Sequence, residues 1–272
     1  MSFSVLMSVY HKENAEHFSL ALKSNLEEQT VKPDEFVLIC DGPLTAELDA
    51  VIEHYVSLYP DVMRIYRFEN NRGLGEALKF GVEKCSFELV ARSDSDDVCE
   101  PDRFEKQLKC FDEDPDLDIV GSDIDEFIID WKEPTRTKNM PTAHSDVVRM
   151  AKFRNPINHM SVMFKKKSVL DCGSYQHLPY AEDYYLWVRA INGGCKFANI
   201  PHVLVHARVG NGMEKRRGNK QYIKSWRVLT RYMRENKMIS RIEACKNMVA
   251  VTAFVCMPGG LRSFVYKKIL RK

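Results

Sequence analysis

Short apolar runs alternate with amphipathic stretches over the first hundred residues of the chain. Leu48, Ile52 and Tyr55 recur at the spacing of one helix face, and Pro60 ends that stretch. The runs between such stretches are almost wholly apolar, as strands buried on both faces of a parallel sheet are. The pattern predicts strands at 3–10, 35–40, 62–68 and 87–92 and a helix at 74–85. This βα rhythm indicates an α/β fold with a sheet flanked by helices.

The pattern becomes less regular after Pro101. It predicts helices at 103–111, 145–153 and 183–192, and strands at 117–122, 124–129, 161–164 and 195–200. The polar, proline-containing stretch from 131 to 144 is expected to be a loop. From Glu214 onward the chain is expected to be mostly helical and basic.

The charges divide unevenly along the chain. Lys and Arg number 40 against 38 Asp and Glu, a net charge of +2. Residues 1–210 hold 24 basic against 35 acidic residues, or −11, and residues 211–272 hold 16 against 3, or +13. An acidic body with a basic tail indicates an anionic partner surface, either nucleic acid or a membrane.

The remaining composition fits a reduced, cytosolic protein. The 8 cysteines are scattered without a C-x-x-C pair, which argues against a disulfide framework or a thiolate zinc site. The first residues lack the basic and apolar regions of a signal peptide. No apolar stretch approaches the roughly 20 residues that span a bilayer. We therefore expect a soluble protein or one that lies on a surface.

Polar and acidic residues follow three of the predicted strands. Tyr10, Asp41 and the run Asp94-Ser95-Asp96-Asp97 come where ligands bind in open α/β sheets, at the carboxyl ends of the strands. Crowded carboxylates raise one another's pKa, and a hard divalent cation removes that cost. Mg²⁺ or Mn²⁺, which takes one or two carboxylates plus phosphate oxygens, suits the run better than the alternative of a solvated acidic turn. The run lacks the Gly and Glu of a calcium EF-hand loop.

Six elements, in order, resemble family 2 glycosyltransferases of the GT-A fold, a Rossmann-like mixed sheet flanked by helices. They are Ser8-Val9-Tyr10 with Glu13, Gln29-Thr30, Asp41-Gly42, Asn71-Arg72-Gly73-Leu74, Asp94-Ser95-Asp96-Asp97 with Pro101 and Arg103, and Ala181-Glu182-Asp183-Tyr184. The resemblance covers residues 3–210, with the basic segment as a helical C-terminal extension. It is strongest to bacterial enzymes that build capsule, exopolysaccharide or O-antigen units.

The resemblance implies a donor site in an α/β half at residues 1–105. Asp41 would accept the uracil N–H, which favours a UDP-sugar, Asp94 would reach the ribose, and Asp96, with Asp94, would hold Mn²⁺ or Mg²⁺. The other residues expected to bind the nucleotide-sugar are Ser8, Val9, Tyr10, Glu13, Arg72 and Ser95. Strand two of the family usually ends in two acidic residues, and here Cys40 takes the place of the first.

The resemblance places the acceptor in residues 106–210 of the same domain. Asp183 would be the general base of an inverting transfer, and Glu182 would position the acceptor or the base. At the first turn of a predicted helix, acidic residues are also favoured by the macrodipole alone. His159 would lie on the acceptor side, and His206 and Arg208 near the diphosphate. The chain lacks the Gln-x-x-Arg-Trp element of processive synthases, so a single sugar addition is expected.

The basic extension, residues 211–272, favours a membrane surface over nucleic acid. Leu261, Phe264, Val265 and Ile269 gather on one side of a predicted helix with basic residues around it, as in an interfacial anchor. We find no nucleic-acid motif, and the acidic body would repel a polyanion. We therefore expect residues 240–272 to hold the protein on the inner face of the cytoplasmic membrane, near a polyprenyl-diphosphate-linked acceptor.

The predicted function is an inverting, metal-dependent transfer of one hexose or N-acetylhexosamine from a UDP-sugar to a saccharide acceptor in surface polysaccharide synthesis. A nucleotidyltransferase is the alternative enzyme, although no Gly-rich triphosphate loop follows the first strand. A non-enzymatic membrane- or nucleic-acid-binding module is the other alternative. It leaves the four acidic residues Asp41, Asp94, Asp96 and Asp183 without a role.

Overall fold

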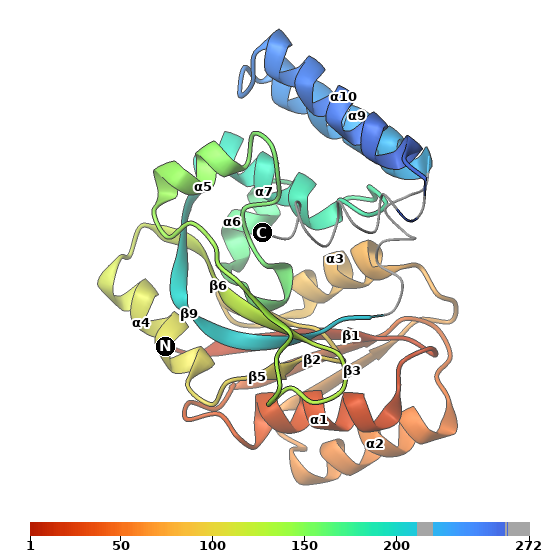
Figure 1. The fold of residues 1–272 in the computed structure, drawn as a ribbon. Coiled ribbons are helices and arrows are strands. Elements are labelled where there is room, and N and C mark those ends of the chain that lie inside the picture. Colours follow the sequence, from red (N-terminus) through yellow and green to blue (C-terminus); the bar gives the residue numbers. More distant parts are fainter. Residues whose placement is uncertain (211–219, 259, 261–272) are drawn as a thin grey trace.

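The computed structural model describes residues 1–210, 220–258 and 260, and one mixed nine-stranded sheet organises them (Figure 1). The strands are β1 Phe3–Val9, β2 Glu35–Cys40, β3 Met63–Arg67, β4 Leu89–Ser93, β5 Val98–Cys99, β6 Leu117–Phe127, β7 Arg136–Lys138, β8 Met163–Lys165 and β9 Lys196–Arg208. Their order is β3-β2-β1-β4-β8-β6-β9-β5, and β7 pairs with β6.

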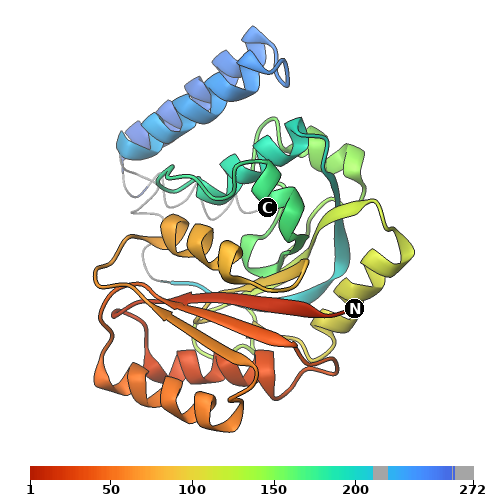
Figure 2. The same ribbon diagram turned by 180° about the vertical axis from the view of Figure 1, so that it is seen from behind.

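Helices cover both faces of the sheet, as Figure 2 shows from behind. They are α1 Ala15–Leu26, α2 Ala46–Leu58, α3 Leu74–Lys84, α4 Arg103–Glu113, α5 His144–Met150, α6 Lys166–Asp171, α7 Glu182–Asn192, α9 Lys220–Glu235 and α10 Arg241–Cys256, with a 3-10 turn at His159–Ser161. The predicted α/β sandwich is confirmed.

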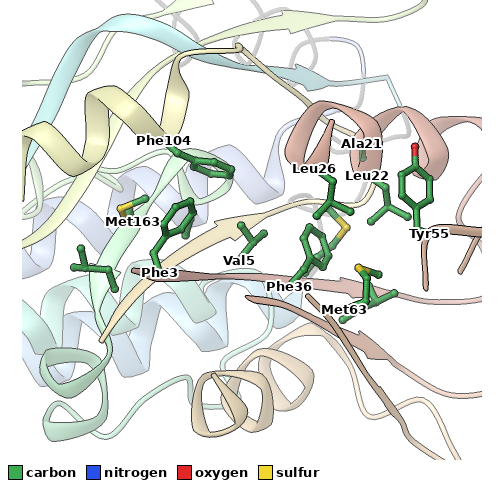
Figure 3. Packing of buried hydrophobic residues seen from close by; sticks show 14 of the residues in the cluster. Phe3, Val5, Ala21, Leu22, Leu26, Phe36, Tyr55, Met63, Phe104 and Met163 are labelled. Carbon is green, nitrogen blue, oxygen red and sulfur yellow. The ribbon is translucent and has the colours of Figure 1, made fainter. Parts of the chain in front are cut away.

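The first half of the chain builds a parallel sheet whose strands are buried on both faces. β1 pairs in parallel with β2 and β4, and Val9 lies opposite Cys40, so that their carboxyl ends are level. Phe3 and Val5 pack with residues of α1, α2 and α4 (Figure 3). Leu6 packs toward α3 on the other face. This two-sided burial explains why the strands are nearly continuous apolar runs.

A fully buried arginine fixes the end of β4. Arg103, the first residue of α4, donates to the Ser93 Oγ at 2.9 Å, to the Arg92 carbonyl at 2.6 Å and to the Cys99 Sγ at 3.0 Å. A buried guanidinium is costly unless its donors are satisfied, and here strand ends supply the acceptors. The acidic run that follows β4 therefore starts from a rigid base.

The two strands predicted at 117–122 and 124–129 are one strand, β6 Leu117–Phe127. Asp123 interrupts the apolar pattern but stays in the strand, because its Oδ1 accepts a hydrogen bond from the Met140 backbone N–H at 2.7 Å. Ile128 and Ile129 lie beyond the strand, 56% and 88% exposed. The local sequence pattern does not reveal a hydrogen-bond partner seventeen residues away.

The strand predicted at 195–200 is also longer, because β9 continues to Arg208. Pro201 would be expected to end a strand. The β6–β9 register skips from Ile200 to Val203, so Pro201 lies in an irregularity of the ladder and pairing resumes after it. The predicted loop at 131–144 holds the short strand β7, and the structure adds β5 and α6, which were not predicted.

The helices α9 and α10 form a hairpin that stands apart from the sheet in Figures 1 and 2. It packs on α7 through Trp226, whose ring lies 5.6 Å from that of Tyr184. None of the helices in the described parts of the chain is long and apolar enough to cross a membrane. The helix predicted around Leu261–Ile269 lies outside the described residues.

Candidate functional site

A buried arginine orients the first aspartate of the acidic run. Arg92, at the end of β4 and 1% exposed, donates from Nη1 to the Asp94 Oδ2 at 2.7 Å and from Nη2 to the Asp94 Oδ1. Two parallel bonds fix the plane of the carboxylate as well as its position. Sequence reasoning missed Arg92, although residues two apart in an extended strand share a face and that spacing was a usable signal.

Several carboxylates crowd around this aspartate. The Ser95 Oγ donates to the Glu13 Oε2 at 2.9 Å, which brings the turn after β1 against the run. Burial, and then the charges of Asp94 and Glu13, raise the pKa of Asp96 to about 7. Burial and the neighbouring carboxylates also raise the pKa of Asp97 well above its ordinary value. The loop therefore holds a surplus of negative charge that a cation would relieve.

Arg208, at the end of β9, joins this loop from the other half of the chain. Its backbone N–H donates to the Asp97 Oδ1 at 2.8 Å, and its Nε donates to the Asp96 carbonyl at 3.2 Å. The guanidinium also lies 4.5 Å above the ring of Phe127. The structure thus places Arg208 beside the acidic run. Its predicted position near the diphosphate stays a prediction.

His206 lies two residues earlier, in a different environment. Its Nε2 lies 2.7 Å from the Glu100 Oε1 and its Nδ1 3.7 Å from the Asp125 Oδ2, and the residue is 6% exposed. The ring of Trp131 packs 5.0 Å from it. The structure therefore gives His206 carboxylate partners in the β5–β9 pairing, opposite Val98, the residue that follows the acidic run.

Asp41 holds the loop that leads into α3. Its Oδ1 accepts from the Arg72 N–H at 2.6 Å, and its Oδ2 accepts from the Gly73 N–H and the Asn71 Nδ2, both at 2.9 Å. Gly42 is required beside it, because its φ is +93° and a Cβ would lie 2.8 Å from the Asn71 backbone nitrogen. Sequence reasoning assigned Asp41 only to the nucleotide base and missed this anchoring role.

The remaining predicted donor residues surround the end of β1. Ser8 is half-buried and Val9 buried, whereas Tyr10, just past the strand, is 40% exposed. The Glu13 N–H donates to the Tyr10 carbonyl at 3.0 Å, a turn that places Glu13 beside Ser95. The Arg72 guanidinium, by contrast, lies 4.3 Å above the ring of Phe68.

The second acidic group begins α7. Asp183 accepts a hydrogen bond at its Oδ2 from the Asn155 Nδ2 at 2.6 Å, which orients the carboxylate. Burial raises the pKa of the adjacent Glu182. A Cβ at Gly75 would lie 3.4 Å from the Glu182 Cγ, so the first turns of α3 and α7 are neighbours. Asn155 was missed, because nothing in the sequence links it to a residue 28 positions later.

His159 occupies an aromatic site between the two acidic groups. Its Nε2 lies 2.8 Å from the Tyr175 hydroxyl, and the rings of Tyr175 and Trp187 lie 5.5 and 6.1 Å from its own. Burial and the positive charge of Arg92 lower the pKa of His159 well below its ordinary value. This lowered pKa favours the neutral imidazole.

The acidic run suits a metal that the substrate helps to hold. Among the described residues, no group of three or more His, Cys, Asp or Glu side chains forms a ready metal cage. Mg²⁺ and Mn²⁺ do not need one, since one or two carboxylates and substrate phosphates suffice. Asp94 and Asp96 fit this requirement, because burial, and then the charges of Asp94 and Glu13, raise the pKa of Asp96.

Acidic residues at the carboxyl edge of the parallel strands, with a second acidic pair at the start of α7, match the arrangement expected of the GT-A glycosyltransferase fold. Solved structures agree: TarS from S. aureus bound to UDP-GlcNAc aligns with a TM-score of 0.65 at 17% identity, over 85% of this chain and 66% of TarS. PcManGT from Pyrobaculum calidifontis, with GDP-Man and Mn²⁺, aligns at 0.63 and 15%, over 96% and 71%. The GT-A fold is thereby confirmed.

The family model for glycosyl transferase family 2 matches residues 4–173, and the chain belongs to this family. It is 40% identical over 266 residues to the amylovoran biosynthesis glycosyltransferase AmsE of Erwinia amylovora, covering 98% of each chain. It is 35% identical over 271 residues to the UDP-Gal:alpha-D-GlcNAc-diphosphoundecaprenol beta-1,3-galactosyltransferase of Escherichia coli, covering 99% and 97%. The protein is a glycosyltransferase of polysaccharide synthesis, so neither the nucleotidyltransferase nor the non-enzymatic alternative holds.

Proposed function

We propose that the protein transfers one hexose or N-acetylhexosamine from a UDP-sugar to a polyprenyl-diphosphate-linked saccharide, with inversion and with Mn²⁺ or Mg²⁺. The name of the Escherichia coli relative, with its UDP-Gal donor and diphosphoundecaprenol acceptor, supports both substrate classes. TarS bound to UDP-GlcNAc and PcManGT bound to Mn²⁺ support the nucleotide and the metal.

On the donor side, the acidic run and Arg208 bind the diphosphate end of the nucleotide-sugar. Asp96 and Asp94 hold the cation, which when bound neutralises charge on the leaving diphosphate. Arg92 keeps Asp94 in place, because both of its carboxylate oxygens accept bonds from that guanidinium. The base lies among Ser8, Tyr10 and Asp41. The loop that Asp41 anchors carries Arg72 beside the base.

On the acceptor side, Asp183 removes the proton from the attacking hydroxyl. Asn155 occupies its Oδ2, which leaves the Oδ1 for that hydroxyl. The acceptor oxygen forms its bond to the anomeric carbon as the bond to UDP breaks, the proton passes to Asp183, and UDP leaves with the bonding electrons. Attack from the face opposite the leaving group inverts the anomeric centre. Glu182 and His159 lie beside this path and position the acceptor.

The observation that carries the proposal is the orientation of two separate carboxylates by dedicated partners. Arg92 holds Asp94 at the donor side, and Asn155 holds Asp183 at the acceptor side. A general base and a metal-binding group need this fixed geometry, whereas carboxylates on a solvated surface do not.

Transfer of labelled sugar from a panel of UDP-sugars to a synthetic GlcNAc-diphosphate-lipid tests the proposal. We expect turnover with Mn²⁺, none in EDTA, and a product of inverted configuration by NMR. Asp183→Asn should abolish turnover but keep UDP binding, whereas Asp61→Asn, on an exposed turn, should change neither. Full turnover by Asp183→Asn would rule out its role as the base.

The location and the division of the chain complete the proposal. Residues 1–105 bind the donor, and residues 106–210 bind the acceptor and contribute Arg208 to the donor side. Residues 240–272 of the basic extension hold the protein on the inner face of the cytoplasmic membrane. The charge of that extension, 16 basic against 3 acidic residues, supports the last step.

A further inference from the structure

The outer surface of the α9–α10 hairpin carries two parallel stripes of different chemistry. α9 packs on the body through the buried residues Trp226, Leu229 and Met233. α10 packs on α9 and reaches the body through Asn247, whose Nδ2 donates to the Lys152 carbonyl at 2.7 Å. In Figure 1, α7 lies between the hairpin and the sheet. The exposed residues of both helices belong to the sides not used in these contacts.

The stripe on α9 is entirely basic. Five exposed cations follow the spacing i, i+4, i+7, i+11, i+14, and they are Lys220, Lys224, Arg227, Arg231 and Arg234. At 100° per residue they fall within an arc of about 80°, opposite the buried side of the helix. None of the five pairs with a carboxylate in the part of the chain that the structure describes. Their charge is thus available to an external anion.

The stripe on α10 is apolar although it faces outward. Ile242 and Val249 are 68% and 65% exposed, and Cys245 and Cys256 continue the same line. The inner face of the helix is apolar apart from Asn247, and the exposed Arg241, Lys246 and Thr252 flank the outer stripe, so α10 lacks one continuous polar face. Its acidic residue, Glu243, is used in the capping box with Ser240. Exposed apolar surface of this kind marks a contact site.

We propose that the α9–α10 hairpin lies flat on an anionic phospholipid bilayer, with the α10 stripe in the interface and the α9 stripe against lipid phosphates. Charge complementarity favours an anionic bilayer as the partner of this surface, because a basic stripe beside an apolar one is the pattern of interfacial helices. A nucleic acid would leave Ile242 and Val249 unexplained. A symmetric dimer through this face would bring two five-cation stripes together.

The proposal rests on the lipid-linked acceptor proposed above and makes that substrate geometrically reachable. α9 packs directly on α7, through the Trp226–Tyr184 contact and through Tyr232, whose ring lies 5.5 Å from that of Tyr185. The first turn of α7 carries Glu182 and Asp183. A bilayer bound to the hairpin is thus one helix away from the proposed base. The surface lies within 220–256, N-terminal to the helix expected at 261–269.

Flotation of the full-length protein with vesicles tests the surface. We expect binding to vesicles of phosphatidylcholine with phosphatidylglycerol, but not to pure phosphatidylcholine. Arg227→Glu with Arg231→Glu should weaken binding roughly tenfold or more. Lys79→Glu with Lys109→Glu, exposed on α3 and α4, makes the same change in net charge and should bind like the wild type. Equal losses in both double variants would overturn the proposal.

The apolar stripe is tested separately. Val249→Asp should reduce flotation without changing the melting temperature, because the side chain is exposed. A polarity-sensitive dye on Cys245 should shift to shorter wavelength with anionic vesicles only. Unchanged flotation of Val249→Asp would refute the membrane contact. It would also be refuted if the wild type formed an oligomer that Val249→Asp converts to a monomer while vesicle binding persists.

Activity on a water-soluble diphosphate-linked saccharide keeps the two proposals distinguishable. All hairpin variants should turn this acceptor over at the wild-type rate, because they leave the site intact. If the wild type floats but transfers no sugar to any acceptor, the proposed function fails and the membrane surface stands. If it transfers sugar but does not float, the membrane contact fails, here and as the location proposed above, and the proposed reaction stands.

Discussion

Asp96→Asn is expected to stabilise the metal-free protein while removing metal-dependent transfer. The carboxyl group lies in a partly buried loop beside Asp94 and Glu13. Burial, and then the negative charges of these two neighbours, raise its pKa from 3.8 to about 7. One pKa unit corresponds to about 1.4 kcal/mol of preference for the neutral form. The ionised group therefore destabilises the folded state at pH 8, and we expect the isosteric amide to recover about 2–4 kcal/mol.

The effect has a defined pH dependence. Between pH 3.8 and about 7 the folded state retains a proton that the unfolded chain has lost, so the free energy of unfolding of the wild type falls as the pH rises. Above about pH 7 both states are ionised and the loss is complete. The stability gap between variant and wild type is thus largest at pH 8, about half as large near pH 5.5, and absent near pH 4.

Thermal unfolding in EDTA measures this gap. At pH 8 Asp96→Asn should melt roughly 5–10 °C above the wild type, whereas Asp61→Asn, an exposed carboxylate, should melt with it. Mn²⁺ with UDP should raise the melting temperature of the wild type but not of Asp96→Asn. A variant that melts at or below the wild type in EDTA at pH 8 would show that no uncompensated charge resides at Asp96.

Three further substitutions address the partners of the site. Asn155→Ala should lower kcat about tenfold or more with an unchanged donor KM, because a hydrogen bond to a charged group contributes about 1.5–3 kcal/mol. A change in KM alone, measured by steady-state kinetics, would contradict this role. Asp41→Ala leaves three loop donors without their acceptor and should lower the free energy of unfolding by about 3 kcal/mol, measured by urea denaturation. Arg92→Met frees Asp94 and should weaken UDP binding with Mn²⁺ at least tenfold by calorimetry, and unaltered affinity would show that Asp94 needs no support.

The parallel half of the fold could be predicted from sequence because its physics is local. Strands buried on both faces are unbroken apolar runs, so β1, β2 and β4 were found within about two residues of their ends. β6 and β9 were predicted too short because Asp123 and Pro201 break the pattern. Both breaks are compensated at a distance, by the Met140 N–H and by a skipped register in the ladder.

The candidate site shows the same division. Acidic residues after strands were identifiable, since the carboxyl edge of the sheet is where ligands bind. Their partners were not, because Asn155 meets Asp183 and Arg208 meets Asp97 only through the fold. Arg92 was missed as well, although its position two residues before Asp94 in an extended segment was a usable signal of a shared face. The anchoring role of Asp41 depends on a loop 30 residues away.

The three hydrogen bonds accepted by Asp41 also bear on how nucleotide preference can diverge among descendants of this enzyme. A substitution there would change the proposed contact to the base and release the loop into α3 in the same step. A change at this position therefore alters the stability of the loop together with the proposed contact to the base. A change of nucleotide preference is expected to begin at neighbouring residues that do not also anchor a loop, such as the exposed Tyr10, while Asp41 is retained.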